Sequence, residues 1–198
     1  DNQLKQLEMQ FLATKKRLEN KFGAKKFIVY FQSFTNTYAP FDTLKALYEK
    51  ALSFDGVLGL SIGTRTDCVT NEILDFLVEK SKDKEIWVEY GIQSFFQTTL
   101  DKINRADNVE NMEFWIKRTK EKGLNVCGHL IYGLPDETEQ MMLETFRKTI
   151  SLNVDSIKFH PLYVVKNTLL TNEYKKGRFE PISEELYIDT VVKSIINL

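Results

Sequence analysis

Four ionisable side chains lie on or next to the C-terminal halves of predicted strands: Glu89, His129, Lys158 and His160. The strands themselves are apolar runs, typical of a parallel sheet that is covered on both faces. In (β/α) barrels the groups that do chemistry stand at the C-terminal ends of the strands. These positions therefore predict a polar rim that is large enough to hold a ligand.

The two histidines are the only ones in the chain. For each of them a hydrogen-bonded core position and a ligand position weigh about equally, because both stand at strand ends. No carboxylate follows at ligand spacing, so they are not expected to hold a metal by themselves. Glu89 lies in an otherwise apolar strand, and an unpaired buried carboxylate is costly. It either pairs with a cation such as Lys158 or Arg65, or faces a polar cavity.

Two arginines and one glutamine are weaker candidates for ligand contacts. Arg65 and Arg105 follow strands or short helices, where arginines are usually solvated, although a rim arginine can bind a carboxylate through two parallel hydrogen bonds. Gln93 suits an amide or a ribose hydroxyl. The basic stretch Lys175–Arg178 is expected in a solvated loop, with a nucleic-acid contact as the less favoured alternative.

The elements that position these groups alternate between strands of about five residues and helices of about twelve. A D-x-x-E pair, Asp136 and Glu139, predicts the start of the helix that continues to Ile150, and Ser183 is placed to cap a closing helix. The predicted strands cover residues 27–31, 57–62, 86–90, 126–131 and 156–161, and the other predicted helices cover about 3–22, 42–53, 71–80 and 111–122.

This alternation predicts an α/β fold with a parallel sheet. A doubly wound sheet usually has a glycine-rich loop after its first strand, and the chain has neither a G-x-G-x-x-G loop nor a P-loop. Polar groups on consecutive strand ends favour a TIM-like barrel instead. Five strands are too few for the complete form, so we expect a partial barrel that is either incomplete or missing its first unit.

The composition of the chain excludes several classes of protein. The 198 residues are 42% hydrophobic, with 27 basic and 28 acidic residues and a net charge of −1. This fits one globular domain over residues 1–198 and argues against a general nucleic-acid clamp. Neither a membrane span nor a signal peptide is visible. Cys68 and Cys127 match no zinc or disulfide spacing and are expected as reduced thiols of a cytoplasmic protein. The start at Asp1 favours a fragment of a longer protein.

Several stretches, in order along nearly the whole chain, resemble the motifs of one family. Tyr90–Ser94 with Ile103–Arg105 resembles the G-V/I-Q-S … V/I-N-R signature of radical S-adenosylmethionine (SAM) enzymes, of the elongator-catalytic-subunit and oxygen-independent coproporphyrinogen oxidase type. His129–Thr138 resembles their fifth-strand motif, and Ser61–Cys68 their T-R-P-D loop with threonine in place of proline. Tyr30–Pro40 is most similar to a bacterial, YhcC-like subgroup that is linked to wobble-uridine modification of tRNA.

The resemblance implies a partial (β/α)6 barrel with SAM bound across its top. The loop containing Gln32, Ser33, Thr35 and Asn36 would meet the methionine amino group, and Ser61 and Gly63 would lie beside the methionine or ribose. Gln93 and Arg105 would contact the ribose and the carboxylate. His129 would lie near the ribose, Ile131–Gly133 with Tyr132 would flank the adenine, and Arg65 would give a further carboxylate or substrate contact.

The resemblance further implies a radical SAM enzyme that binds SAM next to a [4Fe–4S] cluster and generates a 5′-deoxyadenosyl radical. Its partners would be SAM, tRNA as a candidate substrate, and an electron donor such as a flavodoxin or ferredoxin, without a membrane. The family's CxxxCxxC segment is absent from the chain, together with the first strand. Two distant cysteines cannot replace three clustered ones, so no residue here is expected to ligate the metal, and the chain alone is expected to be inactive.

Two other functions compete with this one. A non-catalytic module of the same fold that binds RNA or a protein partner would show Arg and Lys clustered on one face. An ordinary phosphate-handling barrel enzyme would need a glycine-rich loop after its late strands, which His160–Tyr163 does not supply.

Overall fold

The computed structural model describes residues 2–196. Five parallel strands follow the order β1-β2-β3-β4-β5. The chain divides into two compact units, the first with the residues up to Tyr90 and Arg118–Val126, the second with Gly91–Lys117 and Cys127 onward. The single domain expected over residues 1–198 stays a prediction.

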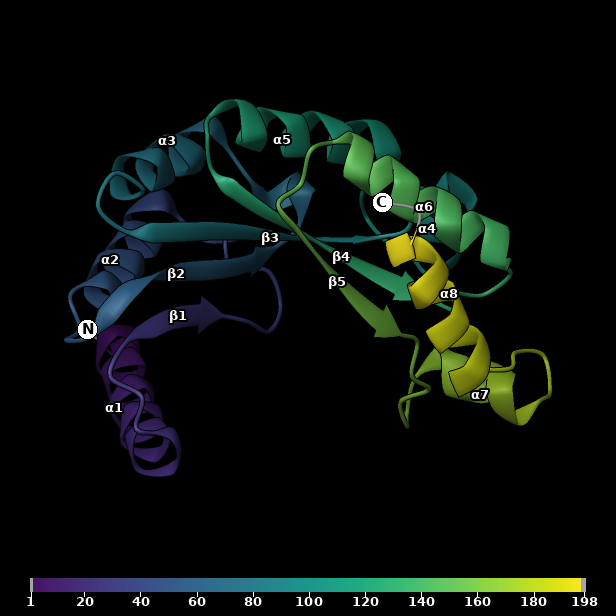
Figure 1. Cartoon of the computed structure of the whole chain (residues 1–198), viewed down its shortest axis with the longest axis horizontal. Coiled ribbons are helices and arrows are strands. Elements are labelled where there is room, and N and C mark those ends of the chain that lie inside the picture. The colour runs from purple at the N-terminus through teal and green to yellow at the C-terminus, as the bar shows by residue number, and fades with distance from the viewer. Residues whose placement is uncertain (1, 197–198) are drawn as a thin grey trace. The chain divides into compact units, whose positions relative to one another are not determined.

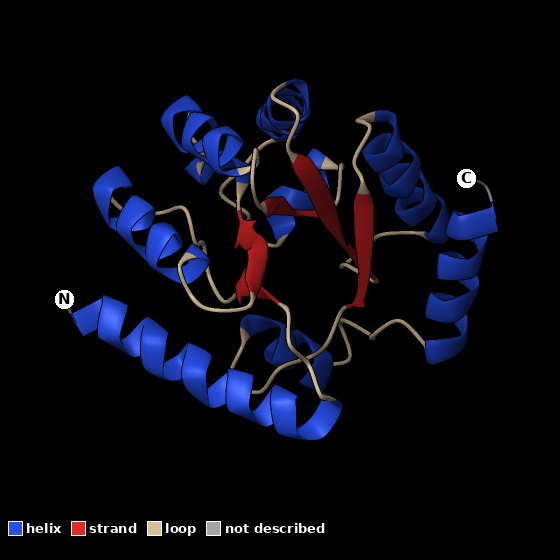
Figure 2. Cartoon of the chain, turned by 60° about the vertical axis from the view of Figure 1, so that its left-hand side comes forward, coloured by secondary structure: helices blue, strands red, loops and turns tan. Residues whose placement is uncertain are grey.

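The first unit is built on three strands. Its elements are α1 (Asn2–Phe22), β1 (Phe27–Phe31), α2 (Phe41–Leu52), β2 (Val57–Thr64), the short 3-10 turn η1 (Thr66–Cys68), α3 (Asn71–Lys80) and most of β3 (Glu85–Gln93). Helices α1, α2 and α3 follow one another along one face of β1 and β2 (Figures 1 and 2). Gly59 allows β2 and β3 to approach closely, because a Cβ atom there would collide with the Glu85 backbone.

The second unit carries the later part of the chain. It contains the end of β3, α4 (Gln97–Lys102), most of α5 (Val109–Glu121) and of β4 (Asn125–Tyr132), α6 (Glu139–Ser151), β5 (Ser156–Pro161), α7 (Leu169–Lys175) and α8 (Glu184–Ile196). Strands β4 and β5 are parallel and in register from Cys127–Ser156 to Tyr132–Pro161. Helices α6 and α8 pack side by side, and Lys193 Nζ lies 2.6 Å from Glu139 Oε1 (Figure 1).

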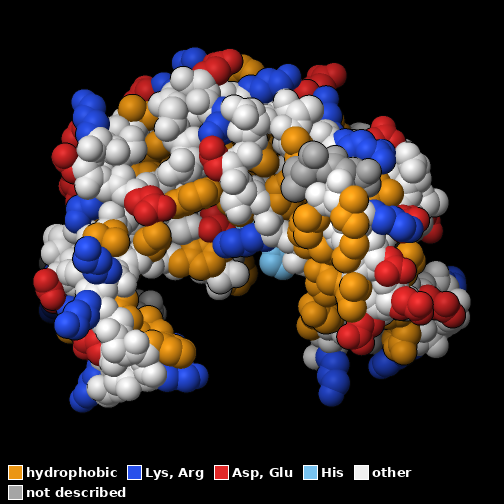
Figure 3. All heavy atoms as spheres, in the orientation of Figure 1, with side chains coloured by type: hydrophobic (Ala, Val, Ile, Leu, Met, Phe, Trp, Pro, Cys, Tyr) orange, Lys and Arg blue, Asp and Glu red, His pale blue; other side chains and the backbone are white. Residues whose placement is uncertain are grey.

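One face of α8 exposes apolar side chains in the second unit. Ile188, Val192 and Ile195, at helical spacing, are 45–52% exposed. Figure 3 shows hydrophobic side chains, in orange, gathered over this helix. The opposite side of the helix is buried through Thr190 and Ser194. Of the described helices, none is long and apolar enough to cross a membrane.

The predicted strands are confirmed, and two predictions about helices are wrong. Helix α6 begins at Glu139 rather than Asp136, because the Thr138 hydroxyl accepts the cap hydrogen bond from the Met141 amide at 3.3 Å. Asp136 instead adopts a left-handed backbone (φ 65°). Helix α7 forms within a segment predicted as a long loop, with Thr168 as its N-cap.

Candidate functional site

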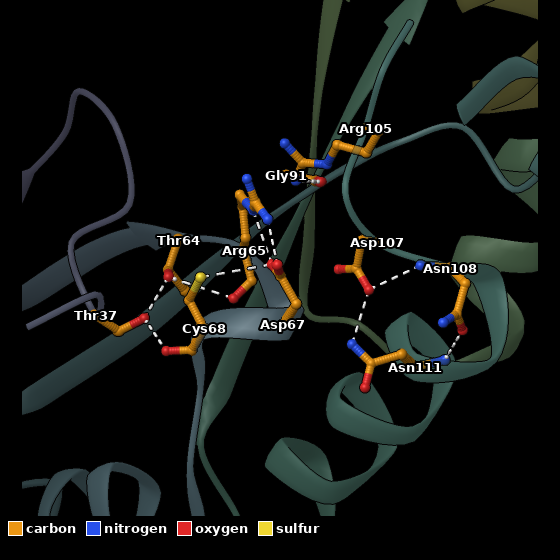
Figure 4. A network of polar contacts seen from close by, with 10 residues as sticks. All are labelled: Thr37, Thr64, Arg65, Asp67, Cys68, Gly91, Arg105, Asp107, Asn108 and Asn111. Atoms are coloured by element: carbon orange, nitrogen blue, oxygen red, sulfur yellow. Dashed lines mark hydrogen bonds and ion pairs between the residues drawn. The ribbon is translucent and has the colours of Figure 1, made fainter. Parts of the chain in front are cut away.

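Three loops of the second unit are tied together by two polar contacts. The Arg105 guanidinium donates to the Gly91 carbonyl oxygen at 2.5 Å, which joins the loop after α4 to the end of β3 (Figure 4). The Ser94 hydroxyl donates to the Glu137 carboxylate, which joins the loop after β3 to the loop after β4. Ser94 is fully buried. These contacts connect the G-I-Q-S, I-N-R and G-L-P-D-E stretches, whose sequences resemble the family motifs.

Left-handed backbone conformations shape the same loops. Gln93 (φ 69°) and Asn104 (φ 56°) adopt the region that side chains other than glycine rarely occupy. Gly133 (φ 86°) is also required for space, because a Cβ atom there would lie 2.6 Å from the Ile182 Cβ atom. Such positions persist only where surrounding contacts hold them, and they cluster at ligand sites.

A mainly apolar pocket of about 590 Å³ opens at the C-terminal ends of β4 and β5. This volume is in the range of small-molecule sites. Lys102 pairs with Asp136, and Arg178 Nε lies 3.0 Å from Glu173 Oε2, so the charged groups in the lining are paired with one another. The charged pairs leave this pocket with a mostly apolar lining. Its lining includes Ile103, Asn104, Ile131, Leu134, Pro135, Leu162, Leu169, Leu170 and Phe179.

Beside this pocket, the Glu137 carboxyl has an unusual proton affinity. Burial raises its pKa above the ordinary value, while hydrogen bonds from Ser94 and Thr99 act in the opposite direction. The net direction is upward because the cost of burying the charged form is the larger of these effects.

The four predicted site residues of this unit have different surroundings. Gln93 and Arg105 are partly buried, and Arg105 is oriented by its bond to Gly91. His129 Nδ1 lies 3.2 Å from His160 Nε2. The Tyr132 side chain is only 1% exposed, and its hydroxyl shares a 2.8 Å hydrogen bond with Ser194 of α8. Only the Tyr132 backbone is therefore suited to contact a ligand at the strand end.

In the first unit, the loop after β1 is built around one side-chain amide. Asn36 Nδ2 donates to the carbonyl oxygens of Phe31 at 3.1 Å, Ser33 at 3.2 Å and Gly63 at 2.9 Å. Ser33 (φ 81°) and Phe34 (φ 58°) are both left-handed, and the Phe34 side chain is fully exposed. The predicted contacts Gln32 and Ser33 are exposed, whereas Thr35 and Asn36 are partly buried.

Glu89 is the buried carboxylate of this unit, 6% exposed. The Tyr30 hydroxyl donates to its Oε2 at 2.9 Å, and the Ser61 hydroxyl donates to its Oε1. From the sequence, we expected Glu89 to pair with a cation or to face a polar cavity, and two hydroxyl donors were not foreseen. The strand register explains these donors. Tyr30 is opposite Ser61 in β1–β2 and Gly63 is opposite Glu89 in β2–β3, so the three polar side chains project from the same face of the sheet.

The loop after β2 contains the third group of the first unit. Arg65 forms two parallel hydrogen bonds with the Asp67 carboxylate, one of them 2.7 Å long (Figure 4). A bond of this kind fixes the guanidinium plane. The Thr37 hydroxyl lies 2.5 Å from that of Thr64 and donates to the Cys68 carbonyl oxygen at 2.6 Å. Arg65 thus binds a carboxylate of its own loop.

The thiols of this chain do not fit an iron–sulfur cluster. The full sequence has two cysteines, Cys68 in the loop after β2 and Cys127 within β4. Cys68 is partly exposed and Cys127 is buried. A [4Fe–4S] cluster of the kind implied by the motifs takes three clustered thiolates, so these residues could not supply its ligands.

Comparison with protein families identifies the motifs. The model described as "Radical SAM superfamily" matches residues 8–149, and the model described as "Radical_SAM C-terminal domain" matches residues 154–198. The first match covers well over half of the chain.

Curated relatives agree with this match. A protein of Methanocaldococcus jannaschii is 43% identical over 89% of this chain and 56% of its own length. YhcC of Escherichia coli K12 is 37% identical over 93% of this chain and 59% of its own length. A tRNA uridine(34) acetyltransferase of Methanocaldococcus infernus is 28% identical over 70% of this chain and 26% of its own length. The chain thus spans somewhat more than half the length of the two more similar relatives.

Solved structures show the same fold class. Archaeal Elp3 from Methanocaldococcus infernus has a TM-score of 0.80 at 22% identity and covers 94% of this chain and 49% of its own. Coproporphyrinogen III oxidase from Escherichia coli has a TM-score of 0.67 at 17% identity and covers 100% and 46%. This confirms the expected α/β fold of the partial TIM-barrel class.

The raised pKa of Glu137 gives a testable pH dependence. The folded protein binds this proton more tightly than the unfolded chain, so the stability it contributes is lost as the pH rises from about 4.3, the unfolded glutamate value, through the folded pKa. E137Q removes this loss and keeps an oxygen acceptor for Ser94. The free energy of unfolding of E137Q minus that of the wild type, from urea titrations, should rise across this pH window. A flat difference for E137Q would contradict the assignment.

Proposed function

Because the chain belongs to the radical SAM superfamily, we propose that it is the SAM-binding core of a radical SAM enzyme. The observation that carries the proposal is the convergence of three motif stretches in the second unit. Ser94–Glu137 and Arg105–Gly91 tie these stretches together, and residues from two of them line the apolar pocket at the ends of β4 and β5.

The apolar pocket supports a site for the adenine of SAM. Ile131 of β4 and Leu162 after β5 stand at the strand ends, and Asn104 offers an amide at the same pocket. Burial of a purine between aliphatic side chains, with a few polar groups to orient it, is the usual composition of such sites. In this proposal Gln93, Arg105 and His129 serve the ribose and carboxylate, and Tyr132 contributes through its backbone.

The loops of the first unit are proposed for the methionine part of SAM. Gln32, Ser33, Thr35 and Asn36 form the loop after β1, and Ser61, Gly63 and Arg65 lie at the end of β2 or just after it. Asn36 positions this loop by its bond to the Gly63 carbonyl oxygen at 2.9 Å. Arg65 would bind a ligand carboxylate only in competition with Asp67.

The proposed enzyme needs a cluster whose ligands are not among these residues. A [4Fe–4S] cluster, when bound, supplies the electron that cleaves SAM. The CxxxCxxC segment would then lie outside these 198 residues, and the complete enzyme would work with a flavodoxin or ferredoxin in the cytoplasm. The 198 residues by themselves should bind SAM without cleaving it.

We further propose tRNA as the substrate, with a wobble uridine as the modified base. The support is the distant relative named as a tRNA uridine(34) acetyltransferase and the fold shared with archaeal Elp3. The Phe34 side chain, fully exposed on a loop held by Asn36, offers a surface on which an unpaired base could stack.

The adenine site can be tested on the 198-residue chain. I131D places a carboxylate at the apolar end of the pocket and should weaken SAM binding at least about tenfold, because burying an unpaired charge is costly. Equilibrium dialysis with labelled SAM measures the affinity. I188D, which places the same group on the exposed face of α8, should bind like the wild type. Equal affinities for both variants, with matching circular dichroism, would remove the pocket from the proposal.

The enzymatic step requires the full-length gene product. After anaerobic reconstitution with iron and sulfide and reduction, we expect a bound cluster and 5′-deoxyadenosine released from SAM, detected by liquid chromatography. The 198-residue chain treated in the same way is the control and should release none. A full-length protein that assembles no cluster and cleaves no SAM would instead favour the non-catalytic module that binds RNA or a protein.

The tRNA proposal has its own test. Deletion of the gene should deplete one modified uridine in the nucleoside profile of total tRNA, measured by mass spectrometry. Complementation with the intact gene should restore that nucleoside, and complementation with an F34A variant should restore less of it. An unchanged profile in the deletion strain would remove tRNA while leaving the SAM chemistry in place.

A further inference from the structure

The segment after β5 concentrates positive charge in a chain whose charges are otherwise balanced. Residues 162–178 contain four basic residues and one acidic residue, whereas the whole chain has a net charge of −1. The acidic residue is Glu173, and Arg178 Nε lies 3.0 Å from its Oε2 atom. The other basic residues, Lys166, Lys175 and Lys176, are exposed. Their ammonium groups therefore give this part of the second unit a positive surface.

Large apolar side chains are exposed in the same segment. Tyr163 is 72% exposed and Tyr174 is 50% exposed, and Leu169 at the start of α7 is 85% exposed. Aromatic rings that lie open among lysines offer stacking surfaces beside positive charges. Proteins that bind single-stranded nucleic acids use this combination.

Hydrogen bonds hold the loop before α7 in one conformation. The Thr168 hydroxyl donates to the Val165 carbonyl oxygen at 2.7 Å and accepts from the Thr171 amide at 3.2 Å, so it both closes the loop and caps α7. The Thr171 hydroxyl donates to the same carbonyl oxygen. After α7, Gly177 is left-handed (φ 67°), which is typical of a residue that follows a helix end. A surface that is ordered in advance loses little conformational entropy when it binds a partner.

The segment also forms part of the apolar pocket at the ends of β4 and β5. Leu169, Leu170 and Arg178 line that pocket, and α7 lies beside the C-terminal end of β5 (Figure 1). Tyr174 follows Leu170 by one helical turn and Lys176 follows Leu169 by two turns, so both continue rows of side chains that begin in the pocket wall. A polymer on this surface would therefore have one of its units next to the pocket.

We propose that this segment binds single-stranded RNA of the kind found in the anticodon loop of a tRNA. The contact residues, here called the α7 surface, are Tyr163, Lys166, Tyr174, Lys175 and Lys176. The lysines would neutralise phosphates, and the two tyrosines would stack on unpaired bases. The choice of tRNA rests on the proposed function, whereas the contact itself rests on the charge, the exposed rings and the nearby pocket.

A second basic stretch of the chain has another explanation. Residues 15–26 contain six basic residues and one acidic residue, at the C-terminal end of α1 and in the turn before β1. The helix dipole favours cations at a helix C-terminus, so these charges stabilise α1 without a ligand. The exposed ring of this stretch, Phe22, already has Lys21 Nζ 4.9 Å from its centroid. Three exposed lysines of this stretch, Lys16, Lys21 and Lys25, therefore provide a matched control.

Fluorescence anisotropy with a labelled anticodon stem–loop RNA, titrated with the 198-residue chain in the absence of SAM, measures the affinity. K166A/K175A/K176A should weaken binding at least about tenfold and lower the slope of log Kd against log salt by about 2, because three phosphate contacts are lost. K16A/K21A/K25A removes the same charge and should keep the affinity and the slope of the wild type. Y163A/Y174A should weaken stem–loop binding at least about fivefold, the effect of one lost stacking contact, and should leave the binding of an RNA duplex unchanged.

Four results would overturn the α7 surface. A wild-type chain that does not bind the stem–loop would exclude the RNA contact, and equal losses in the two triple-lysine variants would reduce it to net charge. A duplex that responds to Y163A/Y174A as strongly as the stem–loop would exclude stacking on unpaired bases. Polyglutamate that displaces the labelled stem–loop as well as unlabelled RNA does would assign the surface to an acidic protein.

These outcomes are separate from those that test the proposed function. The binding assay contains neither SAM nor a cluster, so its failure would leave SAM binding and cleavage in place. An unchanged nucleoside profile in the deletion strain would instead remove wobble-uridine modification, while a measured contact between the stem–loop and the α7 surface would stand.

Discussion

A partly buried hydrogen bond from the Ser94 hydroxyl to the Glu137 carboxylate is the contact on which the candidate site of the second unit depends. It joins loops that are 43 residues apart in sequence, and Ser94 has no exposed surface. Burial of a carboxyl group is costly unless hydrogen bonds satisfy it, so Ser94 and Thr99 offset part of that cost for Glu137. The loop after β4, which leads to the apolar pocket, is held in this way.

Short motifs identify this family because their polar side chains fix the paths of loops through hydrogen bonds. The Arg105 guanidinium donates to the Gly91 carbonyl oxygen, and the Ser94 hydroxyl donates to the Glu137 carboxylate. The Asn36 amide donates to three carbonyl oxygens of its own unit. Each of these side chains determines the path of a loop. Loops that carry the ligand need such support because they lack the regular hydrogen bonds of strands and helices.

Polar groups on the strands follow a second rule, set by register. Glu89 receives hydroxyl donors from β1 and β2, whereas His129 meets His160 of β5. Ser61 and His160 lie on strands next to those of their partners, whereas the Tyr30 hydroxyl reaches Glu89 from two strands away.

The order of strands and helices, the parallel α/β class and the family could all be predicted from the sequence, because they depend on local periodicity and on short motifs. The tertiary structure decided the pairings. Thr138 rather than Asp136 caps α6, since only one of the two has the backbone of a cap residue. Tyr132 packs toward Ser194, a residue 62 positions away. Similarly, His129 and His160 stand 31 positions apart along the chain. They come together because side chains on adjacent parallel strands meet across the sheet, and a linear sequence does not specify which residues of two strands will be opposite each other.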